Sequence, residues 1–182
     1  MRIIGGIYGG RVLHPPKGLP VRPTTNRVKE ALFNALEHRI GLSGARVLDL
    51  FAGTGNVSLE FASWGAAEVV AVDQHPRCVG AIKSAARSLG ANHITVVKSE
   101  VRRYIARLAQ RFDIIFLDPP YGMADQATMI QQILEREALE PDGVMVAEHT
   151  PQLDFSSIPG FQNRRDYGSS TLSFFTLPQS PP

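Results

Sequence analysis

The segment RVLDLFAGTGN, residues 46–56, is the strongest indication of the fold class in this chain. Its first half is a run of apolar residues interrupted only by Asp49, which is typical of a buried β-strand. A turn with two glycines, Gly53 and Gly55, then leads into the helical pattern NVSLEFASWG at 56–65. Glycines at such a junction allow a tight turn and a close approach of a ligand to the helix N-terminus. The stretch therefore predicts a strand, a glycine loop and a helix, although a plain turn would need the same glycines.

The alternation of strand and helix continues along the chain. Further apolar strands are predicted at 68–73, 93–98, 112–118 and 143–149, and helical patterns lie between them at 76–89, 100–110 and 125–137. Strands that alternate with helices favour an α/β fold with a doubly wound, mostly parallel sheet that is covered on both faces. Two strand-like pieces at 163–168 and 170–177 predict a terminal hairpin.

The chain in front of the first strand has a different composition. Its first 24 residues are rich in Gly and Pro, and the apolar pieces RII and RVL flank GGIYGG, which predicts a hairpin-like arm. A helix should follow, capped by Thr24, Thr25 or Asn26 and ended by Gly41. We therefore expect an N-terminal basic arm at 1–24, an α/β domain at 25–177 and a frayed tail at 178–182.

The net charge of +2 hides an asymmetry between the two parts of the chain. Residues 1–46 contain eight Lys and Arg but two acids, a net charge of +6, so the remainder carries −4. A basic arm on a mildly acidic body is typical of a protein that binds a polyanion, although a solvated basic face would look the same.

Several classes of protein are disfavoured by the composition. The chain has no apolar run of membrane-spanning length, no signal-like start, and one cysteine, so an internal disulfide is impossible. Its five histidines are scattered and form no pattern of metal ligands. We expect a cytoplasmic protein without a metal, acting as a monomer and away from membranes.

Four acids stand at or just after the ends of predicted strands: Asp49, Asp73, Glu100 and Asp118. Ligands of doubly wound sheets bind beyond the carboxyl ends of the strands, so these acids should meet at one site. Asp73 is placed to bind the ribose hydroxyls of a nucleoside cofactor, and Asp49 to contact a cationic amino group or brace the glycine turn. Glu100 could accept a hydrogen bond from an adenine, or serve as an acid at a helix start. These features fit either NAD or S-adenosylmethionine.

The segment FLDPPYG, residues 116–122, favours methyl transfer. An exocyclic base nitrogen is a poor nucleophile because its lone pair is delocalised. The Asp118 carboxylate and the Pro119 carbonyl could accept N–H bonds from it and so aim the lone pair at a methyl donor. Pro119 and Pro120 would hold these acceptors in place, and Tyr121 offers a ring on which an extruded base could stack.

These motifs resemble the amino-methyltransferases of nucleic acids. With RIIGG at the start, RPTTNRVKEALFN at 22–34 and the late YGSSTL, the chain resembles the bacterial RsmD-type family, which methylates N2 of a guanine in small-subunit ribosomal RNA. The resemblance covers nearly the whole chain. It implies a seven-stranded Rossmann-like methyltransferase sheet, S-adenosylmethionine as cofactor, and the small ribosomal subunit or its assembly intermediate, with its 16S rRNA, as partner.

The resemblance also implies roles for individual residues. The catalytic segment would be Asp118, Pro119, Pro120 and Tyr121. The cofactor would bind Asp49, Phe51, Ala52, Gly53, Gly55, Asp73 and Glu100. Nucleic-acid phosphates would bind Arg2, Arg11, Arg22, Arg27 and Lys29.

Three other functions stay open from the sequence. The first is an adenine amino-methyltransferase acting on DNA, for which the chain lacks an obvious large target-recognition domain. The second is an RNA-binding assembly factor that keeps the fold without catalysis, against which the intact DPPY argues. The third is a nicotinamide oxidoreductase, which is disfavoured because Ser58 stands at the third glycine position of the dinucleotide fingerprint.

Overall fold

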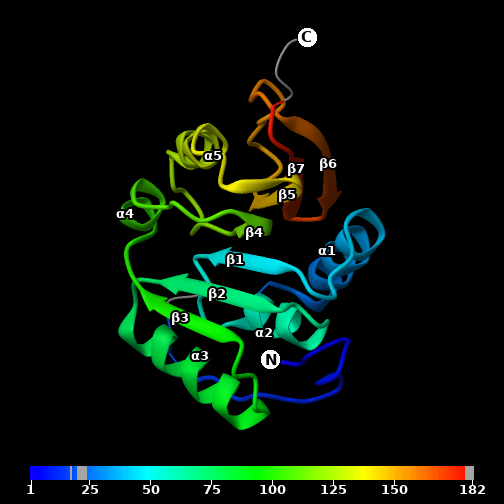
Figure 1. Ribbon diagram of the computed structural model, residues 1–182, viewed down its shortest axis with the longest axis vertical. Helices are drawn as coiled ribbons and strands as arrows, with labels where there is room; N and C mark the ends of the chain where they lie inside the picture. The colour runs from blue at the N-terminus through cyan, green and yellow to red at the C-terminus, as the bar shows by residue number, and fades with distance from the viewer. Residues whose placement is uncertain (17, 20–23, 179–182) are drawn as a thin grey trace.

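A computed structural model of the protein describes residues 1–16, 18, 19 and 24–178. Its centre is one seven-stranded sheet in the order β3-β2-β1-β4-β5-β7-β6 (Figure 1). The strands are β1 (Arg46–Leu50), β2 (Glu68–Asp73), β3 (Ile94–Lys98), β4 (Phe112–Leu117), β5 (Leu139–His149), β6 (Phe161–Tyr167) and β7 (Ser170–Phe175). The first five are parallel to one another, and β7 and β6 add an antiparallel hairpin at the β5 edge. The mostly parallel, seven-stranded sheet is confirmed.

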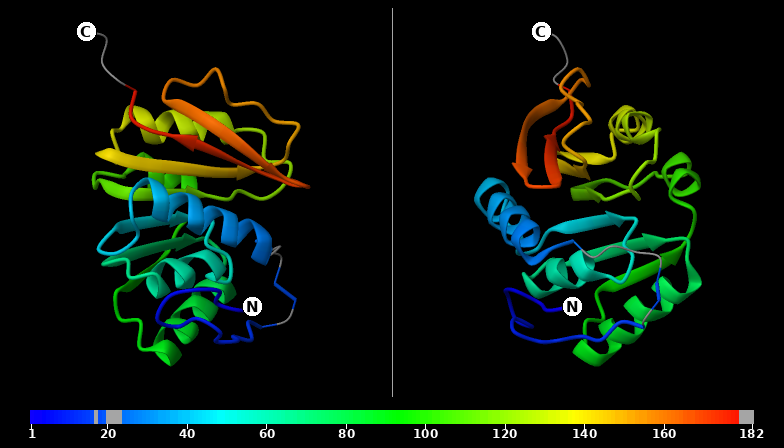
Figure 2. Two further views of the ribbon diagram at one scale, coloured as in Figure 1. Left: turned by 90° about the vertical axis from the view of Figure 1, so that its right-hand side faces the viewer. Right: turned by 180° about the vertical axis from the view of Figure 1, so that it is seen from behind.

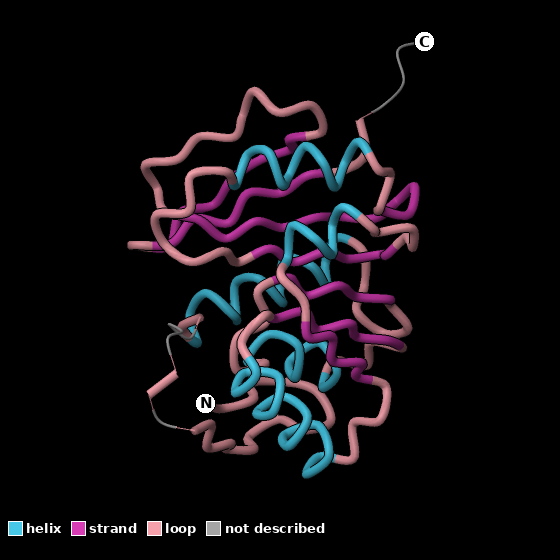
Figure 3. Tube along the Cα trace, turned by 90° about the vertical axis from the view of Figure 1, so that its left-hand side faces the viewer, coloured by secondary structure: helices cyan, strands magenta, loops and turns pink. Residues whose placement is uncertain are grey.

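In the part of the chain that the structure describes, five helices cover the two faces of the sheet. They are α1 (Asn26–Arg39), α2 (Asn56–Ser63), α3 (Pro76–Leu89), α4 (Val101–Ala106) and α5 (Gln126–Glu135). The apolar side chains of α1 and α2 pack with one face of the central strands, and those of α4 and α5 pack with the other. Figure 2 shows α1 lying along its face of the sheet, and Figure 3 shows the side with α4 and α5. The predicted doubly wound arrangement is therefore present.

Two elements differ from their sequence patterns by four residues at one end, and the other elements differ by two residues or fewer. The helix predicted at 100–110 ends at Ala106, because the chain then turns through Arg107 N–H to Tyr104 O and Leu108 N–H to Ile105 O bonds, which buries Leu108. Strand β5 begins at Leu139, four residues before the predicted start. A register shift in its pairing with β4 accommodates the extra residues, which include Pro141.

Helix α1 begins and ends close to the predicted residues. The Thr25 hydroxyl accepts a hydrogen bond from the Val28 N–H at 3.4 Å, so Thr25 is the N-cap among the three candidates. The helix ends at Arg39, and Gly41 follows with a φ of 76°. That left-handed conformation favours glycine, so Gly41 is the stop signal that the sequence predicted.

The N-terminal arm is hairpin-like, as predicted, and packs against α2. Arg2 and Val12 form an antiparallel bridge, and the Ile3 N–H donates to the Arg11 carbonyl at 3.0 Å. The turn of the hairpin reaches α2, where the Ile7 N–H donates to the Ser63 carbonyl at 2.8 Å. The arm is thus attached to the helix that follows the glycine loop.

Within the described residues, no helix has both the length and the apolar character needed to cross a bilayer.

Candidate active site

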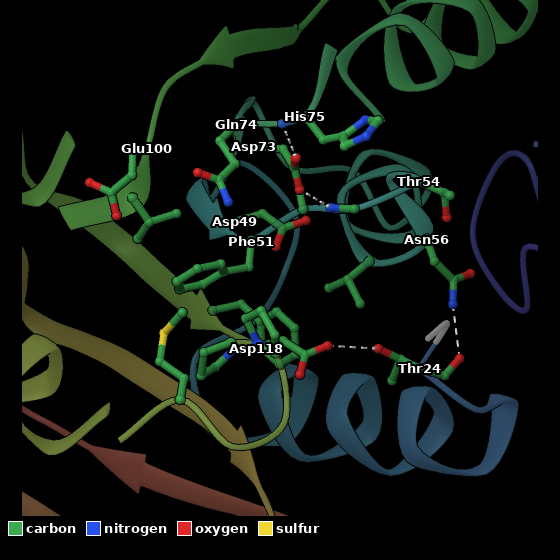
Figure 4. A pocket seen from close by; sticks show the side chains of 18 of the residues that line it. Thr24, Asp49, Phe51, Thr54, Asn56, Asp73, Gln74, His75, Glu100 and Asp118 are labelled. Atoms are coloured by element: carbon green, nitrogen blue, oxygen red, sulfur yellow. Dashed lines mark hydrogen bonds between the residues drawn. The ribbon is translucent and has the colours of Figure 1, made fainter. Parts of the chain in front are cut away.

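A cavity of about 550 Å³ opens at the carboxyl ends of the parallel strands. All four predicted strand-end acids line it, so the expectation that they meet at one site is confirmed (Figure 4). Asp118 lies beside the start of α1, whereas Asp73 lies across the cavity at the end of β2. The cavity therefore has one side built by the glycine loop and β2 and another built by the DPPY segment.

The glycine loop adopts left-handed backbone conformations at three positions. The φ angles are 64° at Phe51, 55° at Gly53 and 82° at Gly55. A side chain at Gly55 would also meet Ile82, whose Cγ1 lies 3.0 Å from the position of a Cβ. Both features explain why glycine is needed before α2. Phe51 is different, because a non-glycine residue in this region costs about 1–2 kcal/mol and such strain concentrates at functional sites.

The Asp73 carboxylate holds the glycine loop against the end of β2. One of its oxygens accepts the Gly53 N–H at 2.9 Å, and the other accepts the His75 N–H at 2.7 Å. Asp73 is buried, and His75 caps α3. Because each carboxylate oxygen can accept more than one hydrogen bond, these contacts are compatible with the predicted ribose role.

Asp49 is a buried acid below the loop. Its carboxylate accepts a short hydrogen bond from the hydroxyl of Ser58 in α2. The pKa of Asp49 is raised to about 7, mainly by burial and also by the Asp73 charge, while the hydrogen bond from Ser58 opposes the shift. The carboxyl therefore changes charge near neutral pH. Ser58, which breaks the dinucleotide fingerprint, is the residue that connects α2 to this acid.

Glu100 is the N-cap of α4. Its carboxylate accepts the Arg102 N–H at 3.1 Å and the Arg103 N–H at 2.9 Å, and it pairs with the Arg102 guanidinium at 3.2 Å. Burial would raise the pKa of Glu100, but these donors outweigh it and hold the pKa below its usual range. This geometry favours the helix-start role that the sequence left open, and the adenine contact stays a prediction.

The DPPY segment leaves β4 as a turn with no cis peptide bond in the described chain. Asp118 is half-buried, Pro119 is buried, and Pro120 is exposed, with its carbonyl accepting the Met123 N–H at 3.2 Å. Tyr121 is 50% exposed and lines the cavity. This arrangement presents an acid and an aromatic ring at the mouth of the cavity.

Thr24 and Asn56 are among the polar side chains of this site that sequence reasoning missed. The Thr24 hydroxyl donates to Asp118 Oδ2 at 3.4 Å, and the Asn56 side-chain amide donates to the Thr24 carbonyl at 2.9 Å (Figure 4). Both residues line the cavity. The sequence predicted Thr24 as a possible helix cap, and the presence of a second threonine that could cap α1 was the available signal that Thr24 serves elsewhere.

The predicted phosphate-binding residues divide into three groups. Arg2, Arg11 and Arg27 are exposed, as phosphate contacts require. Arg22 lies outside the described residues. Lys29 was predicted wrongly, because its side chain is 0% exposed and its ammonium pairs with Glu60 at 3.0 Å. An ammonium buried in this way cannot reach RNA, and its role is structural.

Over the described part of the chain, no group of three or more His, Cys, Asp or Glu side chains is arranged to hold a metal ion.

The comparisons with known proteins place the chain in a family. The family model described as conserved hypothetical protein 95 matches residues 1–176. Ribosomal RNA small subunit methyltransferase D of Escherichia coli K12 is 36% identical over 159 residues, which are 87% of this chain and 79% of that protein. This chain belongs to the RsmD-type rRNA methyltransferase family. The resemblance seen in the sequence is thereby confirmed.

Solved structures show the same fold as this RsmD-type chain. A hypothetical protein of Thermus thermophilus matches with a TM-score of 0.84 and 33% identity, covering 97% of this chain and 99% of that one. The T. thermophilus 16S rRNA N2 G1207 methyltransferase, RsmC, in complex with AdoMet and guanosine, matches with a TM-score of 0.74 and 25% identity. That match covers 97% of this chain and 49% of that one. The Rossmann-like methyltransferase fold is confirmed.

Proposed function

We propose that this chain transfers a methyl group from S-adenosylmethionine to the exocyclic N2 of a guanine in small-subunit ribosomal RNA. The observation that carries the proposal is the cavity in which the glycine loop and the DPPY segment face each other in an RsmD-type chain. The similarity to RsmC, whose structure contains AdoMet and guanosine, supports both the donor and the choice of guanine. We place the reaction in the cytoplasm, on the small subunit or an assembly intermediate.

The donor would lie over the ends of β1 and β2. Phe51, Ala52 and Gly53 line the cavity and bring the backbone close to the donor. Gly55 allows the turn into α2, and Asp73 is placed for the ribose hydroxyls of the donor. Asp49, buried under the loop, would face the positively charged groups of the donor. Glu100 lies at the rim, where its carboxylate could still accept a hydrogen bond from the adenine amino group.

The guanine would enter next to Asp118. The Asp118 carboxylate and the Pro119 carbonyl accept N–H bonds from the amino group and orient its lone pair toward the methyl carbon. Tyr121 supplies a stacking surface for the flipped base. The N–C bond would form as the C–S bond breaks, which leaves the sulfur as a neutral thioether. The methylated nitrogen would give one proton to the Asp118 carboxylate, from which it would pass to water.

The RNA would be held by electrostatic contacts outside the cavity. The exposed Arg27 lies in the first turn of α1, whose start is beside Asp118. The exposed Arg2 and Arg11 lie on the arm, which packs against α2. Guanidinium groups form bidentate contacts with phosphates, and such contacts supply affinity without sequence specificity.

Analysis of the methylated nucleoside tests the proposal. Small subunits and naked 16S rRNA from cells that lack this chain would be incubated with the enzyme and labelled donor, then digested to nucleosides. We expect N2-methylguanosine to carry the label. Label in N6-methyladenine when duplex DNA is offered would favour the DNA enzyme instead, and tight RNA binding without transfer would favour an assembly factor.

Asp49 should make donor binding depend on pH. Below pH 7 the free protein holds a proton on Asp49, since burial raises its pKa to about 7. The positive amino group of S-adenosylhomocysteine favours the ionised carboxylate, so binding releases that proton. The affinity should therefore rise as the pH increases through about 7 and level off above it.

Calorimetry with S-adenosylhomocysteine, in two buffers of different ionisation heat, measures both the affinity and the proton release. The matched variant Asp49→Asn cannot titrate and should bind with little dependence on pH. If the wild-type protein released no proton near pH 7, Asp49 would not face the amino group.

A further inference from the structure

Thr24 connects the two sides of the active-site cavity. Its backbone carbonyl accepts a hydrogen bond from the side chain of Asn56, the first residue of α2, at 2.9 Å. Its hydroxyl donates to Asp118 Oδ2 at 3.4 Å. Figure 4 shows the two contacts leaving Thr24 in different directions, one toward α2 and one toward the end of β4. A single residue before α1 thus connects α2, the helix after the glycine loop, to the DPPY segment.

The position of Thr24 is fixed by the elements around it. Thr24 lies just before α1, and the buried Lys29–Glu60 pair connects α1 to α2 at 3.0 Å. The ammonium of Lys29 also donates to the Arg2 carbonyl of the arm at 2.7 Å. Because α1, α2 and the arm are connected in this way, Thr24 has little freedom to move away from Asp118.

The contact from Thr24 is long for an O–H···O hydrogen bond, whose usual length is about 2.7–2.8 Å. Such contacts are often long in unliganded active sites and shorten in the complex that reacts. If the glycine loop moved toward a bound donor, it would shift Asn56 at the start of α2. Asn56 would in turn shift the Thr24 carbonyl, to which it is hydrogen-bonded. Both Asn56 and Thr24 line the cavity, so a ligand in the cavity lies against the two residues that form this hydrogen bond.

We propose that Thr24 is a positioning residue for methyl transfer, which orients the Asp118 carboxylate through its hydroxyl and is itself held by Asn56. The inference rests on the proposed function, since it assigns Asp118 to the amino group that is methylated. Thr24 touches neither reacting atom. Its effect is on the geometry of the acid, and misplacing an acceptor by about 1 Å can cost roughly 10²-fold in rate.

Three substitutions at two adjacent threonines distinguish an effect on the orientation of Asp118 from an effect on the stability of the protein. Thr24→Val keeps the shape and the backbone carbonyl but removes the hydroxyl, and Thr24→Ser restores a hydroxyl. Thr25→Val removes the cap of α1 without touching Asp118. Each protein would be assayed for single-turnover transfer at saturating donor and RNA, and for its Kd for S-adenosylhomocysteine.

We expect Thr24→Val to lower the single-turnover rate roughly 10- to 100-fold. Its Kd for S-adenosylhomocysteine should stay within about twofold of wild type, because the Asn56 contact uses the backbone. Thr24→Ser should recover most of the rate. Thr25→Val should lower the melting temperature and leave the rate near that of wild type. A wild-type rate in Thr24→Val, or an equal loss in Thr25→Val, would overturn the inference.

A second measurement separates this inference from the proposed function. Hydrogen exchange of the amides in 118–123 does not require turnover, and Thr24→Val should speed it while Thr24→Ser should not. If wild type methylated another base, the proposed choice of guanine would fail, but the rate comparison would still test Thr24. If wild type transferred no methyl group, the proposed function would fail, and unchanged exchange in Thr24→Val would reject the positioning role on its own.

Discussion

Replacing Asp118 by alanine should reduce methyl transfer by roughly 10²- to 10³-fold or more, while the donor still binds. The carboxylate is the side-chain acceptor that the DPPY segment offers to the amino group, and alanine removes it. Donor binding should persist because the glycine loop, Asp73 and Asp49 belong to other strands and keep their own hydrogen bonds. Single-turnover transfer to small subunits and calorimetry with S-adenosylhomocysteine measure the two effects separately.

The matched control at this position is Asp118→Asn. The amide keeps an oxygen that can accept one N–H bond and the Thr24 hydroxyl, but it loses the negative charge. Its transfer rate should therefore lie between those of the wild type and Asp118→Ala. The assignment would be wrong if Asp118→Ala abolished donor binding but kept measurable transfer, because Asp118 would then be part of the donor site.

The part of the site that could be predicted from the sequence follows from the periodicity of the chain. Asp49, Asp73, Glu100 and Asp118 lie at or just after the ends of apolar strands, and the carboxyl ends of parallel strands meet at one edge of the sheet. Their meeting at one site could therefore be predicted without knowledge of any long-range contact. The glycine loop could be predicted for the same reason, since its strand, turn and helix are adjacent in the sequence.

The parts that could not be predicted depend on contacts between distant segments. Thr24 meets Asn56 and Asp118, which lie 32 and 94 positions further along the chain, and no local pattern encodes either contact. Lys29 was assigned to the RNA surface from its charge. Its spacing of four and seven residues from Phe33 and Leu36 places it on the buried side of α1, which was the available signal against that assignment.

The Lys29–Glu60 pair is the most buried charged contact among the described residues, since both side chains are 0% exposed. Glu60 Oε1 accepts hydrogen bonds from the Ile4 and Gly5 N–H groups and the Trp64 indole, and Oε2 accepts from Ile4 and Lys29. One carboxylate thereby connects the arm, α1 and α2. Breaking such a pair on one side leaves an uncompensated buried charge, which is far more costly than losing an exposed pair.

Glu60→Gln should therefore destabilise the protein by about 3–5 kcal/mol, although the side chain barely changes in size. Either orientation of the new amide directs an NH₂ group at existing donors: at Lys29 on the Oε2 side, or at Gly5 and Trp64 on the Oε1 side. For a chain of this length we expect the melting temperature to fall by about 10 °C or more. Urea unfolding followed by circular dichroism gives the free energy of unfolding directly.

Two further variants show whether the buried charge is the cause. Lys29→Met combined with Glu60→Gln removes the unpaired ammonium and should recover part of the stability, because apolar replacements of buried pairs are often well tolerated. Arg111→Ala breaks an exposed pair with Glu137 and should change stability by about 0–1 kcal/mol. If Glu60→Gln unfolded at the same urea concentration as wild type, the pair would not hold the arm and α1 on α2. The fixed position of Thr24 would then need another source, so this measurement also bears on how the acid of the active site is oriented.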